Sequence, residues 1–291
     1  MSDDLLVSNL FSVKDKVALI TGGGSGIGKM IAKAFVKNGA IVYIASRNKT
    51  GVSRDKSSLD DVAKELTEMG PGKCFSIEAN LDSKDACEKL VTDFKNLGND
   101  KLDILVNNSA TGHDAGLTDF PEDAWDKIYN LNVKCVFYLT MAVYIYTSFL
   151  PLLEKASKKL VDPSRVIITG SILGIGQGEL KVVQALGICT LAYGSSKSAV
   201  HSVSKNLAVY LTPRGINVNV LAPGNVPVST RIAELDEIGI SEIPQGRVGG
   251  ELDMAGAALY LASRASSWIS GIELVVDGGN LLQFKLTDVQ K

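Results

Sequence analysis

The chain is poor in the residue types that build histidine-based or metal-dependent sites. Its 291 residues include only two histidines, His113 and His201. A histidine-based triad or a metal cluster therefore has little material. The four cysteines are scattered and form no CxxC pair. This spacing favours buried thiols in a reducing compartment over a disulfide framework or a zinc site.

Net charge and targeting signals are equally sparse. The formal net charge is -2 at pH 7, which leaves no general basic field for nucleic acid or an anionic membrane. The amino terminus, Met1-Ser2-Asp3-Asp4, is acidic and lacks the basic and then apolar order of a signal peptide. We therefore expect a cytoplasmic protein that acts on small molecules and has no nucleic-acid partner.

Charge is absent from one long stretch, Cys135 to Leu153, which covers 19 positions. That length is enough to cross a bilayer. The stretch also contains Thr140, Thr147 and Ser148, and Pro151 would disturb its end. A core helix that also packs against a second subunit needs the same apolar character on all sides. Both interpretations stay open at this point, and we favour the buried helix.

What the chain does have is a regular alternation of short apolar strands and longer helical segments. Strands are expected at 17–20, 41–45, 73–79, 102–106, 165–169, 216–221 and 272–276. Helices are expected after the first strand and at 58–69, 83–97, 122–150, 193–211 and 251–262. This order predicts an α/β fold, a Rossmann-like doubly wound parallel sheet of about seven strands in three αβα layers.

No linker or repeat divides the sequence, so we expect one domain over residues 1–291, with a leader at 1–14 and a tail at 281–291. Ligands of such sheets bind beyond the carboxyl ends of the strands. We expect the turn after Ile20 to lie at that edge, together with Arg47, Asn107, Ser171 and Pro223.

The first strand runs directly into a glycine-rich turn and then an amphipathic helix. Strand, turn and helix in this order let backbone amides and a helix amino terminus meet a pyrophosphate. The expected cofactor contacts here are Thr21, Gly22, Gly24, Ser25, Gly26, Ile27 and Gly28. The spacing is TGxxxGxG rather than GxGxxG, and a glycine-rich turn without a ligand remains an alternative.

The second strand ends at Ser46-Arg47-Asn48. A cofactor without a 2′-phosphate is usually held at this place by Asp or Glu, and neither is present. Arg47 offers a planar fork suited to a phosphate, and Ser46 and Asn48 add donors. These residues favour NADP(H) over NAD(H), with a solvated arginine as the alternative. Asn80-Leu81 follows the third strand and is placed to border an adenine ring.

Tyr193 and Lys197 stand four positions apart at the start of a helical segment. Residues at this spacing share one helix face. A lysine there stabilises a phenolate and lowers the tyrosine pKa toward the range of a general acid or base. An isolated pair of this kind is also compatible with a half-buried surface tyrosine. Asn132, a polar amide inside an apolar helix, marks either a structural hydrogen bond or a site.

Together these motifs resemble the short-chain dehydrogenase/reductase family over roughly residues 14–280. The residues that carry the resemblance are those of the glycine turn, Asn107, Asn108, Asn132, Ser171, Tyr193, Lys197, Pro223 and Gly224. Each stands in the family's order and on the expected kind of element. The resemblance implies a homotetramer, for which the charge-free stretch offers one apolar face, and no metal.

The resemblance also assigns roles to individual residues. Tyr193 would protonate the substrate carbonyl oxygen as hydride arrives, or accept the proton in the reverse direction. Lys197 would lower the Tyr193 pKa and hydrogen-bond the nicotinamide ribose. Ser171 would donate to the substrate oxygen, and Asn132 would hold a water that links Lys197 to solvent. Further cofactor contacts are expected from Asn108, Pro223, Gly224 and Val226.

Some positions depart from the family pattern. Ala110 replaces a glycine after the fourth strand, and Asn80 stands where an aspartate commonly borders the adenine. Val228 occupies the place of an expected threonine, so that Ser229 or Thr230 must serve the nicotinamide amide, if any residue does.

The distance from Ser171 to Tyr193 is the largest departure, because 22 positions is several more than the family pattern. The additional residues lie within 174–190 and include several apolar side chains. They either line a pocket for an apolar substrate or form a surface flap or subunit contact.

These features favour an NADPH-dependent carbonyl reductase that acts on an apolar ketone or a 3-oxoacyl thioester. The segment after the second strand and the connection at 154–164 resemble fungal reductases labelled as 3-oxoacyl carrier-protein reductases of the rhamnolipid type. A polyol or sugar dehydrogenase of the same family is the second hypothesis. A dinucleotide-binding sensor or scaffold without catalysis is the third.

Overall fold

The structure, a computed structural model, describes residues 2–47, 58–141, 147–176, 190–227, 240 and 243–282. One parallel sheet is built from β1 Val17–Thr21, β2 Ile41–Ser46, β3 Lys73–Glu78, β4 Ile104–Asn107, β5 Ser164–Thr169, β6 Ile216–Pro223 and β7 Glu273–Val276. The order across the sheet is β3-β2-β1-β4-β5-β6-β7. Because β1 pairs with both β2 and β4, the sheet changes its direction of growth between β1 and β4. Ligands of doubly wound sheets bind at such a switch point.

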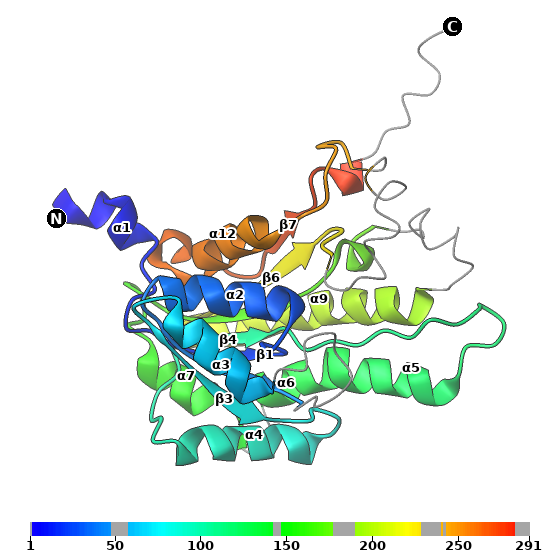
Figure 1. Ribbon diagram of the computed structural model, residues 1–291, viewed down its shortest axis with the longest axis horizontal. Helices are drawn as coiled ribbons and strands as arrows, with labels where there is room; N and C mark the ends of the chain where they lie inside the picture. Colours follow the sequence, from blue (N-terminus) through cyan, green and yellow to red (C-terminus); the bar gives the residue numbers. More distant parts are fainter. Residues whose placement is uncertain are drawn as a thin grey trace, which may run out of the picture.

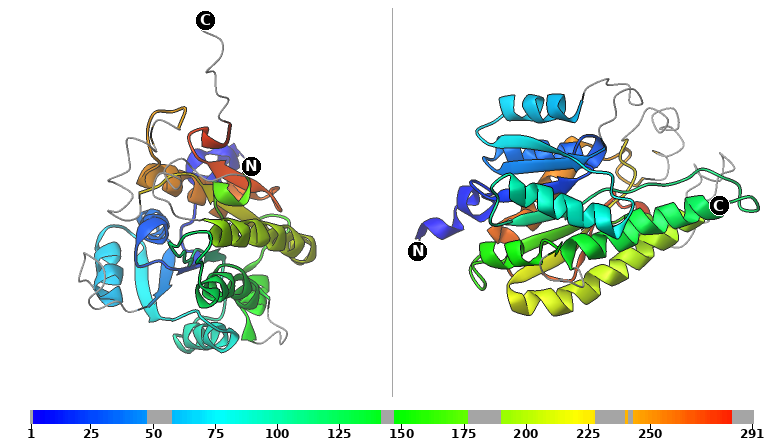
Figure 2. Two further views of the ribbon diagram at one scale, coloured as in Figure 1. Left: turned by 90° about the vertical axis from the view of Figure 1, so that its right-hand side faces the viewer. Right: turned by 90° about the horizontal axis from the view of Figure 1, so that it is seen from below.

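Helices cover both faces of the sheet (Figures 1 and 2). Their bounds are α1 Val7–Leu10, α2 Gly26–Lys37, α3 Leu59–Glu68, α4 Lys84–Asn96, α5 Glu122–Tyr129, α6 Cys135–Thr140, α7 Leu150–Ala156, α9 Leu191–Leu211 and α12 Glu251–Ala262. Apolar residues of α2, α3 and α12 share one core cluster with Ala18 and Ile20. Those of α4, α6, α7 and α9 share the other cluster with Val17 and Leu19. Successive residues of β1 therefore serve opposite faces of the sheet.

The central strands β1, β4, β5 and β6 are buried along their whole length. A parallel sheet covered on both faces needs such continuous apolar runs, because no strand face meets water. This requirement explains why central strands such as β1 and β4 could be recognised from the sequence, whereas β3 and β7, at the edges of the sheet, are only partly buried. The predicted doubly wound fold is confirmed, and β6 extends two residues beyond its predicted end, to Pro223.

The predicted single helix over 122–150 is wrong. Helix α5 passes into the π-helical turn η2, Asn130–Lys134, and then into α6. The helical path ends at Thr140, because Met141 has an extended backbone with φ -147° and ψ 91°. Residues 142–146 lie outside the part that the structure describes.

The chain then folds back on itself. The backbone N–H of Phe149 donates to the carbonyl of Leu139 at 2.9 Å. A new helix, α7, starts at Leu150 and holds Pro151 in its first turn. Proline suits a helix start because its missing N–H would have no partner there. Pro151 thus begins a second helix rather than ending a long one.

The charge-free stretch contributes to the core in its described parts. Cys135, Val136, Leu139, Phe149 and Leu153 are all buried beneath the sheet. Among the described residues, no helix has the length and apolar character to span a membrane. These burial values support the core interpretation of the stretch.

Candidate active site

The glycine-rich turn connects β1 to α2 at the switch point. Thr21 ends β1, and its buried hydroxyl accepts the backbone N–H groups of Asn108 (2.9 Å) and Ser109 (3.0 Å). Gly22 adopts φ +67°, a left-handed conformation that favours glycine. A Cβ on Gly28 would lie 2.3 Å from the Gly22 carbonyl oxygen. The first turn of α2 therefore packs directly on the backbone of the turn, which only glycine permits.

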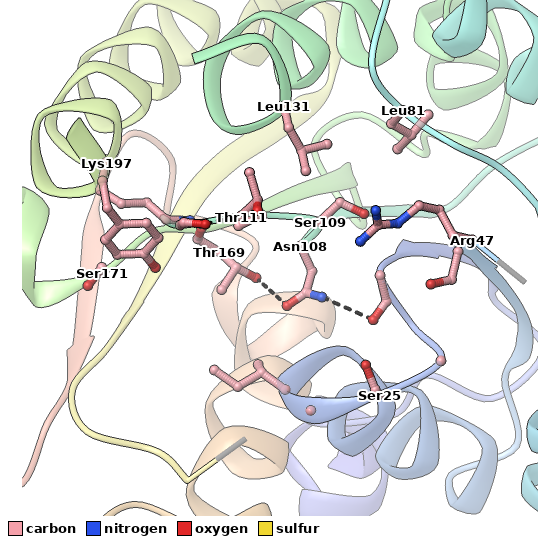
Figure 3. Close-up of a pocket in the computed structure, with 18 of the residues that line it drawn as sticks. Ser25, Arg47, Leu81, Asn108, Ser109, Thr111, Leu131, Thr169, Ser171 and Lys197 are labelled. Carbon is pink, nitrogen blue, oxygen red and sulfur yellow. Dashed lines mark hydrogen bonds between the residues drawn. The ribbon is translucent and has the colours of Figure 1, made fainter. Parts of the chain in front are cut away.

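Asn108 joins the ends of three strands. Its side-chain Nδ2 donates to the Thr21 carbonyl at 3.0 Å. Its Oδ1 accepts from the Thr169 hydroxyl at 3.2 Å (Figure 3). These contacts bridge β1, β4 and β5 at their carboxyl ends. The amide predicted to touch the cofactor also holds the floor of the site rigid.

The amino terminus of α2 is open toward solvent space. Ser25 precedes this 12-residue helix, makes no side-chain cap, and no acidic residue stands in the first turn. A cleft of about 1060 Å³ borders this end, and Gly22, Gly24, Ser25, Gly26 and Ile27 line it. Glycines leave the wall free of side chains, so that uncapped amides and the positive end of the helix dipole meet the cleft. The residues present therefore fit the phosphates of a dinucleotide.

The far end of the cleft lies at the end of β2. Ser46 and Arg47 both line it, and the Arg47 guanidinium extends into the cleft (Figure 3). Asn48, the third predicted contact, lies outside the described residues. The Ser46 side chain also lies near Gly24, whose added Cβ would approach its Cβ to 3.6 Å. The end of β2 and the glycine-rich turn thus lie side by side along the cleft, and both present groups that bind anions.

The corner after β3 carries the two residues predicted to border an adenine. Leu81 is buried, and Asn80 lines the cleft beside it. The Asn80 amide donates to Asp82 at 2.5 Å, and Asp82 also lines the cleft. A carboxylate therefore does stand at this corner, two positions later than the family pattern places it.

Three of the predicted catalytic residues meet at the other end of the cleft. Tyr193 and Lys197 lie on α9, and Ser171 follows β5. The Lys197 ammonium lies 5.5 Å from the centroid of the Tyr193 ring and donates to the Thr169 carbonyl at 2.7 Å. The Ser171 hydroxyl accepts the N–H of Leu173 at 3.1 Å. The phenol, the ammonium and the serine are thereby brought together, and Figure 3 shows Lys197 and Ser171 at this end of the cleft.

The pKa of Tyr193 moves in the direction opposite to the expected one. Burial raises it to about 12, and the hydrogen bond with Ser171 only partly offsets this rise. Burial also lowers the pKa of Lys197 to about 8. Desolvation by burial is the largest cause of both shifts, because it disfavours the charged form of each group.

Asn132 lies in the π-helical turn η2 and is almost fully buried. Its Oδ1 accepts from the Thr111 N–H at 2.9 Å, and its Nδ2 donates to the Thr111 carbonyl and the Ser196 hydroxyl, both at 3.0 Å. Of the two interpretations of this amide, the structural hydrogen bond is present. π-helical turns also occur often at functional sites.

The end of β6 closes the remaining side. Pro223, Gly224 and Val226 line the cleft as expected. Gly224 is needed for packing, because an added Cβ would lie 2.7 Å from Asp277. Residues 228–230 and most of the 174–190 segment lie outside the described residues, and the predictions made for them stay predictions.

Most predicted site residues therefore border one cleft, from Arg47 at one end to Tyr193 at the other. Thr21, Gly28 and Asn132 stand behind its wall and support residues that line it. The sequence analysis missed Asp82, Thr111, Leu131 and Thr169. Thr169 is the last residue of β5, so the rule that strand ends carry the site would have indicated it.

The seven-stranded fold, the glycine turn and the tyrosine–lysine pair on α9 define an oxidoreductase of the dinucleotide-binding class. A family model described as enoyl-(acyl carrier protein) reductase matches residues 22–280. The chain belongs to the short-chain dehydrogenase/reductase family. The predicted family and its nicotinamide cofactor are confirmed.

Among particular proteins, the chain is similar to the rhamnolipids biosynthesis 3-oxoacyl-(acyl-carrier-protein) reductase of Pseudomonas aeruginosa. The two are 37% identical over 274 residues, 92% of this chain and 97% of the relative. Short-chain dehydrogenase/reductase PhomF of the fungus Diaporthe leptostromiformis is 33% identical over 306 residues, with 97% and 96% covered. The solved Pseudomonas aeruginosa RhlG/NADP active-site complex matches with a TM-score of 0.79 and 36% identity, covering 93% of this chain and 98% of its own.

Proposed function

We propose that this chain uses NADP(H) to reduce a ketone or 3-oxo group of an apolar substrate to a secondary alcohol. The single observation that carries the proposal is the convergence of Tyr193, Lys197 and Ser171 at one end of a cleft whose other end holds Arg47. When bound, the nicotinamide supplies the hydride. The chain has to place the carbonyl, supply its proton and stabilise the charge that develops on oxygen.

Tyr193 is the proton donor in this proposal. Because burial raises its pKa to about 12, the phenol keeps its proton at neutral pH, as an acid in the reduction direction must. Protonation of the carbonyl oxygen leaves a phenolate in a desolvated place, and a nearby positive charge must then stabilise it. The Lys197 ammonium, 5.5 Å from the ring centroid, is that charge.

Ser171 and Lys197 divide the remaining work. The Ser171 hydroxyl accepts from the Leu173 N–H and is hydrogen-bonded with Tyr193. In the proposal it turns its proton to the substrate oxygen that lies beside both groups. Burial lowers the pKa of Lys197 to about 8. Because this value is still above neutral pH, the side chain stays charged there, yet it releases a proton more readily than an ordinary lysine. Asn132 bonds to Ser196 on α9 and to Thr111 in the loop after β4. It therefore holds in place the helix that carries Tyr193 and Lys197.

The choice of NADP(H) rests on the end of β2. No acidic residue occurs in β2 or at Arg47, and an aspartate or glutamate is the usual partner of a free ribose 2′-hydroxyl. Arg47 extends into the cleft and matches a phosphate with two parallel donors. The NADP complex of the Pseudomonas aeruginosa relative supports this assignment.

The preference for an apolar substrate rests on the catalytic end. Ile172, Leu173 and Val226 line the cleft next to Ser171. The name of the Pseudomonas aeruginosa relative, a 3-oxoacyl carrier-protein reductase, points to the same substrate class. Apolar walls favour alkyl or aryl groups by excluding water from them.

A substrate panel with purified protein tests the proposal. Oxidation of NADPH is followed with alkyl and aryl ketones and 3-oxoacyl thioesters, and reduction of NADP⁺ with polyols and sugars. We expect turnover with the ketones and thioesters. Turnover confined to polyols or sugars would replace the substrate class, and nucleotide binding with no turnover on any of these would favour a sensor or scaffold.

The role of Tyr193 is tested with a matched pair of variants. Tyr193→Phe should lose about a hundredfold to ten-thousandfold in kcat while keeping the thermal stability and NADPH affinity of the natural protein. Tyr210→Phe, at an exposed tyrosine near the end of the same helix, should retain full activity. An active Tyr193→Phe variant would refute the assigned acid.

A further inference from the structure

A buried histidine lies directly behind Ser171. His201 is on α9, one helical turn after Lys197, and is only 3% exposed. The proposed mechanism does not use it. Of the two histidines in the sequence, it is the one enclosed by the core, where a polar ring needs hydrogen-bonding partners.

The ring contacts the catalytic serine through the backbone. The Ser171 N–H donates to His201 Nε2 at 3.3 Å. The neighbouring amide, Gly170 N–H, still bonds to the Leu221 carbonyl on β6 at 2.8 Å, so Ser171 is the first residue beyond the sheet ladder. His201 therefore provides the acceptor at the point where β5 leaves the sheet.

Gly170 is required for this contact. A Cβ at that position would lie 2.1 Å from His201 Nε2 and 2.6 Å from a methyl group of Val220. No side chain fits there while the imidazole stays in place. The local sequence Gly170-Ser171 is thus matched to a histidine 30 positions later.

The other ring nitrogen, Nδ1, faces an ion pair between Glu273 and Lys205. His201 Nδ1 lies 3.4 Å from the Glu273 carboxylate on β7. The same carboxylate pairs with Lys205 Nζ at 2.7 Å. Because Nε2 accepts a hydrogen bond from the Ser171 N–H, the single proton of the neutral ring belongs on Nδ1, toward Glu273.

We propose that neutral His201 is a positioning residue that holds Ser171 in its carbonyl-recognising place, and that protonation of the ring releases this hold and lowers activity in acid. The proposal rests on the proposed reductase function. A protonated imidazole carries two N–H groups and no acceptor. Its Nε2–H would then point at the Ser171 N–H, so neither donor would have an acceptor. Leaving a buried donor without an acceptor destabilises the folded state.

The charges around the ring set the direction of the effect. Burial lowers the pKa of His201 most strongly, the Glu273 carboxylate raises it, and Lys197 and then Lys205 lower it. Below the usual histidine pKa of about 6.5, the unfolded chain binds a proton that the folded chain still excludes. Activity should therefore be complete at neutral pH and fall only as pH drops below this usual value.

Three variants separate positioning from simple packing. His201→Gln can place an uncharged acceptor near the site of Nε2, so it should keep most of the kcat and lose the acid limb. His201→Leu removes the acceptor and should lower kcat roughly three- to tenfold with NADPH affinity unchanged. Glu273→Gln removes the group that raises the pKa, so it should move the acid limb to lower pH. Ser202→Ala, at the exposed neighbouring position, is the control for changes in α9.

The tautomer of His201 can be determined by NMR, with no need for enzymatic turnover. With imidazole-¹⁵N labelling in a His113→Asn background, His201 is the only histidine left. We expect an unprotonated Nε2 and a protonated Nδ1 at neutral pH, and a Ser171 amide resonance that moves as His201 titrates. A proton on Nε2 at neutral pH, or an acid limb that persists in His201→Gln, would overturn the proposal. Absence of any carbonyl turnover would instead refute the proposed function, and the tautomer and amide signals would still decide the contact.

Discussion

The two ends of the cleft are built in different ways. The turn end uses residues that follow one another in the sequence, and its contacts come from backbone groups and from glycines such as Gly22 and Gly28. The catalytic end takes Ser171 from a strand end and Tyr193 and Lys197 from a helix. It buries groups whose pKa values are shifted, whereas the turn end owes its fit to shape.

The two ends therefore lose stability for different reasons, close packing at the turn and desolvation of charged groups at the catalytic end. A backbone cradle for phosphates needs close packing, and its weak point is any added atom. The catalytic end excludes water from an ammonium and a phenol, which destabilises their charged forms. Changes at the turn end should therefore act on cofactor binding and folding, and changes at the catalytic end on rate and pH dependence.

Replacing Lys197 should have the largest effect. Lys197→Met keeps the length of the side chain but removes the charge that stabilises the Tyr193 phenolate. We expect a loss of about a hundredfold or more in kcat, measured by steady-state NADPH oxidation. The Thr169 carbonyl also loses the donor that reaches it at 2.7 Å.

In the absence of cofactor, the same variant measures how much burial of the Lys197 ammonium destabilises the folded protein. Its pKa is lowered from 10.5 to about 8 in the folded chain. Between these two values the unfolded chain holds a proton that the folded chain has released, so the natural protein becomes less stable, relative to Lys197→Met, as pH falls from 10.5 to 8. Chemical denaturation across this range checks the sign. A constant difference between the two proteins would mean that Lys197 is not desolvated, and the contrast between the two ends would fail.

Replacing Arg47 should separate the two cofactors. Arg47→Leu removes the charged donors at the end of β2, so NADPH affinity should fall about ten- to a hundredfold, while NADH affinity changes little. Arg47→Lys keeps the charge but lacks the guanidinium fork, so its NADPH affinity should lie between those of the natural protein and Arg47→Leu. Titration of nucleotide fluorescence measures all three. Equal losses for NADPH and NADH would show that the guanidinium does not contact the 2′-phosphate.

Crowding the turn should act on stability and cofactor affinity with little effect on the chemical step. Gly28→Ala places a Cβ where the Gly22 carbonyl oxygen is only 2.3 Å away, and overpacking of this kind costs about 1–3 kcal/mol. Gly256→Ala is the matched control, since this glycine lies inside α12 and its added Cβ meets nothing within 4 Å. Thermal unfolding and NADPH titration compare the pair. Equal melting temperatures for the two variants would show that the turn tolerates the added atom.

The same contrast explains what sequence reasoning could and could not reach. The turn from Thr21 to Gly28 and the Tyr193–Lys197 pair lie within single short segments, so their spacing carries the geometry. Central strands such as β1 and β4 were readable because burial on both faces imposes continuous apolar runs. These features depend on local pattern alone.

The errors arose where distant parts of the chain decide the outcome. After the break that follows Thr140, Phe149 bonds back to Leu139, a contact that no local pattern shows. The Tyr193 pKa depends on how much water the surrounding elements exclude, and spacing to Lys197 does not report that. His201 was dismissed because two histidines make no triad, yet its contact joins α9 to the end of β5.

The smallest expected effect lies at the adenine corner, at Asn80 and Asp82. Asp82 accepts from Asn80 and borders the cleft, but it is exposed, and exposed polar pairs contribute about 0.2–1 kcal/mol. Asp82→Ala should therefore raise the Kd for NADPH and for NADH alike by less than about fivefold, with kcat unchanged. Asp85→Asn, at an exposed carboxylate outside the cleft, controls for the loss of one negative charge from the surface. If Asp82→Ala lowered kcat instead, the corner would belong with the catalytic end, and the division of the cleft by type of contact would have to be redrawn.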